Sequence, residues 1–108
     1  MEGLISIYIM CADRKEALTL SKLLVQQKLV ACANYFPVES VYRWNGEIQT
    51  EGEYALIAKS LEKQWDQIIK VITEQHSYEC PCIIKYKVDA NKAYIEWVKE
   101  SIDGTTKS

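Results

Sequence analysis

Sulfur and nitrogen donors that could bind a metal ion concentrate in one short stretch of the chain. His76, the only histidine, is followed by Glu79 and by the pair Cys80 and Cys82. A further cysteine, Cys11, ends an apolar run near the N-terminus. Thiolate and imidazole ligands together suit soft or borderline ions such as Cu(I), Cu(II) or Zn(II). The residue types therefore indicate a candidate metal site.

Each of these donors also has a structural explanation. The Cys-x-Cys spacing alone is a weak signal, and free cysteines are commonly small buried hydrophobic residues. Packing is the explanation that we favour for Cys32, which lies in an apolar stretch. His76 would also suit the C-terminus of a helix, where its partial positive charge interacts favourably with the helix dipole. For Cys11 and His76, metal binding and packing both remain open.

A long predicted hairpin over 31–60 dominates the elements that must position these donors. Alternating side chains, rich in β-branched and aromatic residues, flank Asn45 and Gly46, which tolerate the positive φ of a two-residue type I′ turn. Arms of about fourteen residues extend roughly 45 Å, against about 17–20 Å for an ordinary strand. We expect a bulge or bend at Pro37 and at Gly52, where the arms change partner.

The tip of this hairpin extends too far for one small domain to cover. It carries Tyr42, Trp44 and Ile48, which would leave apolar surface and unpaired backbone groups in water. The sequence therefore predicts that another copy of the chain covers the tip.

The remaining patterns predict two further strands and three helices. The apolar run over 4–11 is typical of a buried central strand, and residues 82–88 form a second strand. Apolar residues at helical spacing predict helices over 13–28, 60–76 and 91–102.

Each predicted helix begins at a residue that is suited to cap it. These N-cap residues are Asp13, Ser60 and Asn91. Glu16 follows Asp13 by three residues and completes a capping box.

The order of these elements predicts an α+β fold of the ferredoxin-like type. It reads β-α-β-β-α-β followed by a C-terminal helix, which gives one antiparallel sheet with a long central hairpin and two helices on one face. We expect a single domain over 1–103 and a flexible tail over 104–108. The other face of the sheet has no helix over it, which again predicts a partner chain.

Size and composition exclude several classes of protein. With 108 residues, the chain has the ordinary size of a single domain. Its net charge of −2 and its pI near 5.4 argue against nucleic-acid binding. It has neither the roughly 20 consecutive apolar residues of a membrane helix nor the basic start of a signal peptide. We therefore expect no membrane insertion, a cytoplasmic location and reduced cysteines.

The sequence offers little for catalysis. It has no motif typical of hydrolases, phosphate-binding loops, dinucleotide-binding folds or zinc proteases. One histidine without an evident acidic partner is a poor basis for general acid–base chemistry, so we expect no enzymatic activity. Glu47, Glu51 and Glu53 are interpreted as a solvated strand face.

Aromatic residues offer a second type of site. A cleft between subunits could bind a small molecule, lined by Tyr42, Trp44, Tyr78, Tyr94 and Trp97, and Lys59 could bind an anion there. Aromatic residues are also frequent in buried interfaces, and that is the role we favour for them.

Several motifs occur in order along nearly the whole chain. They are Leu-Val-Ala-Cys-Ala-Asn at 29–34, then Pro37, Ser40, Tyr42, Trp44, Gly46 and Ile48, then Glu53, Leu56, Lys59 and Ser60, then His-Ser-Tyr-Glu-Cys-Pro-Cys-Ile-Ile at 76–84, and finally Tyr94 and Trp97. With these motifs the sequence resembles the CutA family, the divalent-cation tolerance proteins.

The resemblance implies a homotrimer, in which the long hairpins join neighbouring sheets, and a role in tolerance of divalent metals such as copper. The metal positions suggested for the family fall on Cys11, His76 and Cys82, and Cys80 is a fourth candidate ligand. Cys82 stands where the family usually has Glu, which softens the site toward Cu(I) or Zn(II). Ser77 replaces the usual Pro, which leaves the approach to the next strand less rigid.

Three functions remain open at this point. The leading hypothesis is a non-enzymatic trimer that binds copper or zinc ions through these Cys and His ligands. The second is a PII-like signalling or small-ligand-binding trimer that uses the clefts between subunits. The third is a structural or scaffolding trimer. The sequence does not identify the metal, its oxidation state or any protein partner.

Overall fold

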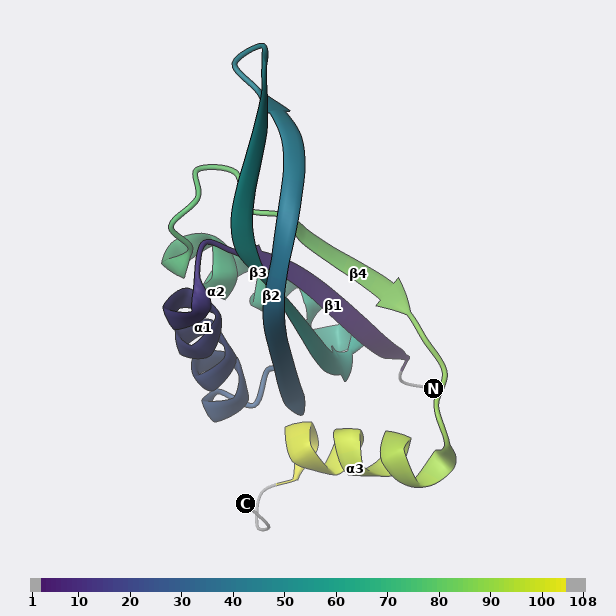
Figure 1. The fold of residues 1–108 in the computed structure, drawn as a ribbon. Coiled ribbons are helices and arrows are strands. Elements are labelled where there is room, and N and C mark those ends of the chain that lie inside the picture. Colours follow the sequence, from purple (N-terminus) through teal and green to yellow (C-terminus); the bar gives the residue numbers. More distant parts are fainter. Residues whose placement is uncertain (1–2, 105–108) are drawn as a thin grey trace.

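The protein folds around a four-stranded antiparallel sheet (Figure 1). A computed structural model describes residues 3–104. The strand order is β2-β3-β1-β4. The elements are β1 (Leu4–Cys11), α1 (Arg14–Gln26), β2 (Cys32–Trp44), β3 (Glu47–Leu61), the 3₁₀ turn η1 (Glu62–Gln64), α2 (Trp65–Gln75), β4 (Ile83–Lys87) and α3 (Lys92–Asp103). The predicted α+β, ferredoxin-like arrangement is confirmed.

Strand β1 lies between β3 and β4, and its side chains alternate between the two faces of the sheet. Its residues Ile5, Ile7, Ile9 and Cys11 are fully buried in the core that α1 and α2 complete. The alternate residues Ser6, Tyr8 and Met10 are only half-buried, because successive side chains of a strand point to opposite faces. We call the face that α1 and α2 cover the helix face, and the other the open face.

The two covering helices bury one apolar stripe each. In α1 the stripe contains Ala17, Leu20 and Leu24, and in α2 it contains Ile68 and Ile72. These residues recur at intervals of three and four, which places them on one side of a helix. Their burial against β1 and β3 fixes both helices on the same face of the sheet (Figure 1).

The hairpin of β2 and β3 projects beyond the other elements (Figure 1), and the longest dimension of the molecule is 49 Å. At its tip, Asn45 and Gly46 have φ angles of 52° and 79°, as the predicted type I′ turn requires. β1 pairs with β3 only as far as Tyr54. Beyond that point the arms of the hairpin pair with each other alone.

The hairpin has no bulge at Pro37 or at Gly52, so the bulge part of that prediction is wrong. Pro37 pairs with Tyr54 and Gly52 pairs with Glu39, in one unbroken register from the base of the hairpin to its turn. β2 is an edge strand, where proline is tolerated because its missing N–H can face away from the sheet.

The N-terminus of α1 is capped largely as predicted. The backbone N–H of Glu16 donates to Asp13 Oδ1 at 2.9 Å. The Glu16 carboxylate does not return to Asp13 as in a capping box; it accepts from the backbone N–H of Ala12. The helix ends at Gln26, slightly earlier than predicted, because Lys28 adopts a φ of 59° and turns the chain toward β2.

Ser60 does not cap α2, so that prediction is wrong. β3 continues through Ser60 to Leu61, and α2 begins only at Trp65, after η1. The fully buried Ser60 hydroxyl donates to the backbone carbonyl of Leu29 at 2.5 Å. It therefore satisfies a carbonyl of the α1–β2 connection that would otherwise be buried without a partner.

Helix α3 lies at the end of the sheet opposite the hairpin tip (Figure 1). Val98 and Ile102 are buried in a small second cluster with residues from the ends of β1 and β3. Asn91 occupies the N-cap position, but its side chain makes no capping hydrogen bond. Of the predicted tail over 104–108, only Gly104 belongs to the described residues.

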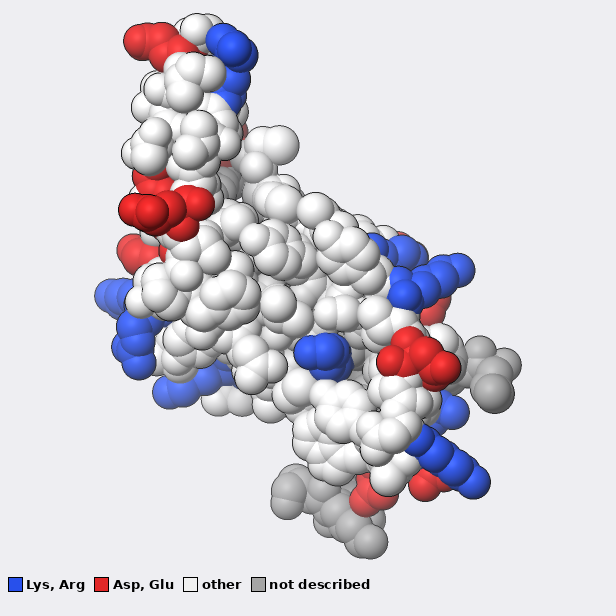
Figure 2. All heavy atoms as spheres, turned by 45° about the vertical axis from the view of Figure 1, so that its right-hand side comes forward, with Lys and Arg blue, Asp and Glu red and all other residues white. Residues whose placement is uncertain are grey.

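The open face and the hairpin tip carry exposed apolar side chains. Phe36, Ile84 and Tyr86 on the open face are 42%, 40% and 55% exposed, and Trp44 and Ile48 at the tip are 55% and 61% exposed. Figure 2 shows a broad area below the hairpin that is almost without charged side chains. An uncharged surface that carries exposed apolar side chains is typical of an interaction surface.

Replacing Gly46 by Ala should destabilise the hairpin, whereas the same change at Gly52 should not. An added Cβ meets no heavy atom within 4 Å at either position. Gly46, however, has a φ of +79°, and a left-handed conformation costs an L-residue about 1–2 kcal/mol. We expect amide hydrogen exchange beside the turn to accelerate roughly 5- to 30-fold in Gly46→Ala. Equal exchange rates in the two variants would contradict this explanation.

Candidate metal centre

Three potential ligands from separate elements meet on the helix face of the sheet. They are Cys11 at the end of β1, Glu16 in the first turn of α1 and His76 directly after α2. One donor atom from each lies within 4.8 Å of the other two. The structure thus brings together Cys11 and His76 of the predicted ligands and adds Glu16, whose spacing from Asp13 had predicted only a capping role.

The ring of His76 is held in one tautomer by the backbone. Its side chain is fully buried. Nε2 lies 2.7 Å from the carbonyl oxygen of Met10, and Nδ1 lies 3.0 Å from the backbone nitrogen of Tyr78. A carbonyl only accepts and an amide N–H only donates, so Nε2 carries the proton and Nδ1 holds the lone pair. In this neutral ring, the 3.8 Å approach of Nδ1 to Glu16 Oε2 is a contact rather than an ion pair.

Glu16 connects three segments of the chain. Its Oε1 accepts from the backbone N–H of Ala12, and its Oε2 accepts from the backbone N–H of Ser77, both at 2.8 Å. Burial by itself would raise the pKa of this carboxyl group, but the hydrogen bonds from Ala12 and Ser77 outweigh burial, so the pKa is lowered. The carboxylate therefore fixes the loop after α2 to the end of β1 and the start of α1.

The thiol of Cys11 lies in a dry environment. It is completely buried. Burial raises its pKa to about 12, and the carboxylates of Glu16 and Asp13 add to the effect. The free protein therefore holds Cys11 as a protonated thiol at neutral pH, and a metal ion that binds there must displace that proton.

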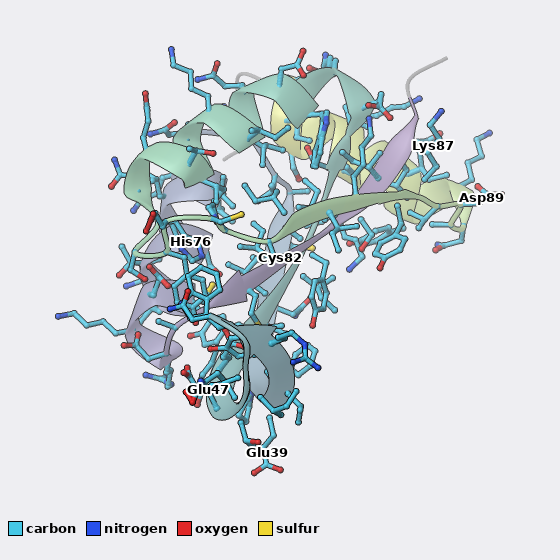
Figure 3. All side chains as sticks on the ribbon, turned by 90° about the horizontal axis from the view of Figure 1, so that it is seen from above. Glu39, Glu47, His76, Cys82, Lys87 and Asp89 are labelled. Carbon is cyan, nitrogen blue, oxygen red and sulfur yellow. The ribbon has the colours of Figure 1, made fainter. Side chains whose placement is uncertain are left out.

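Cys80 and Cys82, the other two predicted ligands, are exposed and do not belong to this group. The β1–β4 register pairs Ile9 with Ile83, and the N–H of Met10 donates to the carbonyl of Cys82 at 3.3 Å. Continuing that register puts Cys82 opposite Met10, on the open face. Figure 3 shows Cys82 where the loop from His76 joins β4. The sheet therefore separates Cys82 from Cys11.

A groove of about 770 Å³ lies between the hairpin and the loop after α2. Its lining residues are Met10, Ser40, Tyr42, Trp44, Gln49, Glu51, Glu53, Ser77, Tyr78, Glu79, Cys80 and Cys82. Three of these are acidic and none is Lys or Arg, so the groove favours positively charged groups.

Glu53 is buried in this groove rather than solvated, so its assignment to a solvated strand face is wrong. It is only 8% exposed, and the hydroxyl of Tyr78 donates to its Oε2 at 2.5 Å. Burial and this hydrogen bond raise the pKa of Tyr78. The alternation of side chains along the strand could not show that the loop after α2 closes over Glu53.

The residues proposed for a small-molecule cleft do not all come together. Tyr42 and Trp44 line the groove, but Lys59 and Trp97 are not among its lining residues. Trp97 packs on Tyr94 with ring centroids 5.6 Å apart, on α3. Cys32 is half-buried, and its Sγ lies 3.2 Å from the hydroxyl of Tyr94. This contact agrees with a packing role for Cys32.

Comparison with known proteins identifies the family. A family model described as "CutA1 divalent ion tolerance protein" matches residues 5–101. The chain belongs to this family. The divalent-cation tolerance protein CutA of Archaeoglobus fulgidus is 32% identical over 98 residues, which are 90% of this chain and 96% of the relative. The suspected family resemblance is confirmed.

Solved CutA structures share the fold over nearly the whole chain. The crystal structure of CutA1 from Oryza sativa has a TM-score of 0.91 and 31% identity, and the comparison covers 95% of this chain and 96% of the other. CutA1 from Ehrlichia chaffeensis has a TM-score of 0.90 and 32% identity, with 94% and 97% covered.

The names of the relatives do not agree on a compartment. A rice relative is named chloroplastic, and the structure from A. fulgidus is described as periplasmic. Within residues 3–104, no helix is long and apolar enough to cross a membrane. The cytoplasmic location stays a prediction.

Replacing Glu16 by Gln should lower the free energy of unfolding by about 1–3 kcal/mol, because one amide oxygen replaces two carboxylate acceptors and a backbone N–H loses its partner. Glu74→Gln, at an exposed position of α2, is the matched control. Urea unfolding at neutral pH measures both changes.

The effect of Glu16→Gln should also depend on pH. The pKa of Glu16 in the folded protein lies below its ordinary value of 4.5. Its contribution is therefore complete above that value and is lost as the pH falls through the folded pKa. The difference between parent and variant should shrink when unfolding is repeated near pH 3; a difference that stays constant would contradict the assigned role.

Proposed function

We propose that this protein serves in divalent-cation tolerance by binding a soft or borderline ion, Cu(II) or Zn(II), through Cys11, Glu16 and His76, and that it is not an enzyme. The observation that supports this proposal is the approach of the three donor atoms to within 4.8 Å. Membership in a family whose relatives are named divalent-cation tolerance proteins points in the same direction.

The donor set fits such an ion chemically. Thiolate, imidazole and carboxylate are all zinc ligands, and at bond lengths of about 2.0–2.3 Å tetrahedral ligands lie roughly 3.5 Å apart. If the distances between the three donor atoms shortened by about 1 Å, all three could bind one ion. A metal-binding histidine commonly donates its other ring N–H to a backbone carbonyl, and His76 donates to Met10 in this way.

Binding would exchange contacts that the free protein makes. The lone pair of His76 Nδ1 accepts from the backbone N–H of Tyr78, so this hydrogen bond must open. The Glu16 carboxylate holds the adjacent N–H of Ser77. Ion binding in this proposal therefore shifts the loop after α2, which also forms one wall of the groove.

We further infer that the chain assembles as a homotrimer. Support comes from the exposed apolar residues of the open face and the hairpin tip and from the outer edges of β2 and β4, with which no other strand of residues 3–104 pairs. A second copy of the chain would pair such edges and remove the apolar surface from water.

A second candidate function is binding of a small molecule in the groove, as in a PII-like signalling trimer. The groove volume of about 770 Å³ and its aromatic residues Tyr42, Trp44 and Tyr78 favour this function. Its three acidic residues favour a cationic ligand rather than the anion that Lys59 suggested. A purely structural trimer would need neither the groove nor the ligand group.

Ion binding is tested by native mass spectrometry of the reduced protein with Zn(II). We expect His76→Ala and Cys11→Ser to bind one ion per chain fewer than the parent, because each loses a ligand. Cys32→Ser is the matched control, since Cys32 lies outside the group, and it should bind as many ions as the parent. Parent-like binding in both ligand variants would refute the proposed site.

Assembly is tested by Trp44→Ala, which removes an exposed aromatic side chain from the hairpin tip. We expect a lower melting temperature that depends more strongly on protein concentration, because assembly rather than the subunit fold is weakened. Val25→Ala, which truncates a side chain 42% exposed on α1, is the control. Sedimentation that shows an intact trimer for Trp44→Ala, with an unchanged melting temperature, would contradict the proposed interface.

A further inference from the structure

We propose that Cys80 and Cys82 form a second, separate site that binds a thiophilic divalent ion of the Zn(II) or Cd(II) class in the groove beside the hairpin. Their two thiolates are the protein ligands, and water completes the coordination. This site goes beyond the function proposed above and does not depend on the group of Cys11, Glu16 and His76.

The two thiols are arranged for chelation by the residue between them. Proline has its φ fixed near −65° and disfavours a helical conformation of the residue before it. Cys80 lies in a bend, and Pro81 and Cys82 belong to neither a helix nor a strand, so a single residue of fixed φ separates the two cysteines. Both cysteines are exposed and line the same groove. A single ion can therefore be reached by both sulfur atoms.

The sheet keeps this pair apart from the first group. Cys82 lies opposite Met10 on the open face, whereas Cys11 is buried on the helix face. Met10 also lines the groove, so its thioether adds a third soft sulfur to the same surface. Sulfur donors favour zinc-class and softer ions over Mg²⁺ or Ca²⁺.

Charge decides between a divalent ion and Cu(I). Binding converts two thiols to thiolates and releases two protons. A divalent ion replaces those protons without a change of net charge, whereas Cu(I) leaves one additional negative charge. Glu51, Glu53 and Glu79 already line the groove, and none of its lining residues is Lys or Arg. Additional negative charge is unfavourable there, so the groove favours the divalent ion.

The experiment is an anaerobic titration of the reduced full-length protein with Cd(II), followed by ultraviolet thiolate-to-metal absorption and native mass spectrometry. Cys11→Ser serves as the background, because it removes a ligand of the first group that lies on β1 rather than on the loop that carries Cys80 and Cys82. We expect this variant to retain one Cd(II) per chain and a thiolate band. Adding Cys80→Ser or Cys82→Ser should abolish both signals, whereas adding Cys32→Ser should leave them unchanged.

Two results would overturn the inference. One is the absence of Cd(II) binding in Cys11→Ser, and the other is a thiolate band that survives both Cys80→Ser and Cys82→Ser. The two proposals fail separately. If Cys80→Ser and Cys82→Ser leave the Zn(II) stoichiometry of the parent unchanged while Cys11→Ser lowers it, the first site stands and the second does not. The converse pattern refutes the first site alone.

Discussion

The alternation of side chains along β1 is the constraint on which the arrangement of the ligands depends. Because β1 pairs with β3 on one side and β4 on the other, its residues cannot rotate without breaking two ladders of hydrogen bonds. Cys11 therefore faces the helices, and its neighbour Met10 faces the open side. Because β4 pairs with β1, Cys82 lies opposite Met10 and on the same open face. A shift of one residue in register would exchange the two faces and place both cysteines differently.

Glu16 holds the segments that carry Cys11 and His76 next to each other. It lies in the first turn of α1, and its carboxylate accepts from the backbone at the end of β1 and in the loop after α2. The same loop presents His76 to the helix face and contributes Tyr78, Cys80 and Cys82 to the groove. The two surfaces therefore share one loop, so displacement of that loop at His76 would alter the groove as well. The hairpin supplies the other groove wall and the apolar tip.

Local patterns predicted the elements and their order along the chain, because alternation, helical stripes and the Asn45–Gly46 turn each follow from nearby residues. They failed where a distant contact decides the outcome. Ser60 continues a strand because its hydroxyl meets the carbonyl of Leu29, and Glu53 is buried because a loop distant in sequence closes over it. For the ligands, residue chemistry selected Cys11 and His76, but the recruitment of Glu16 and the position of Cys82 on the opposite face depend on the register of β1 and β4.

The most direct test of this account is an anomalous diffraction experiment on crystals of the protein grown with Zn(II). The account predicts an ion on the helix face, coordinated by Cys11, Glu16 and His76, with Cys82 outside its coordination shell. A single ion bound jointly by His76 and Cys82 would contradict the separation of the ligands by the sheet, and with it the central claim.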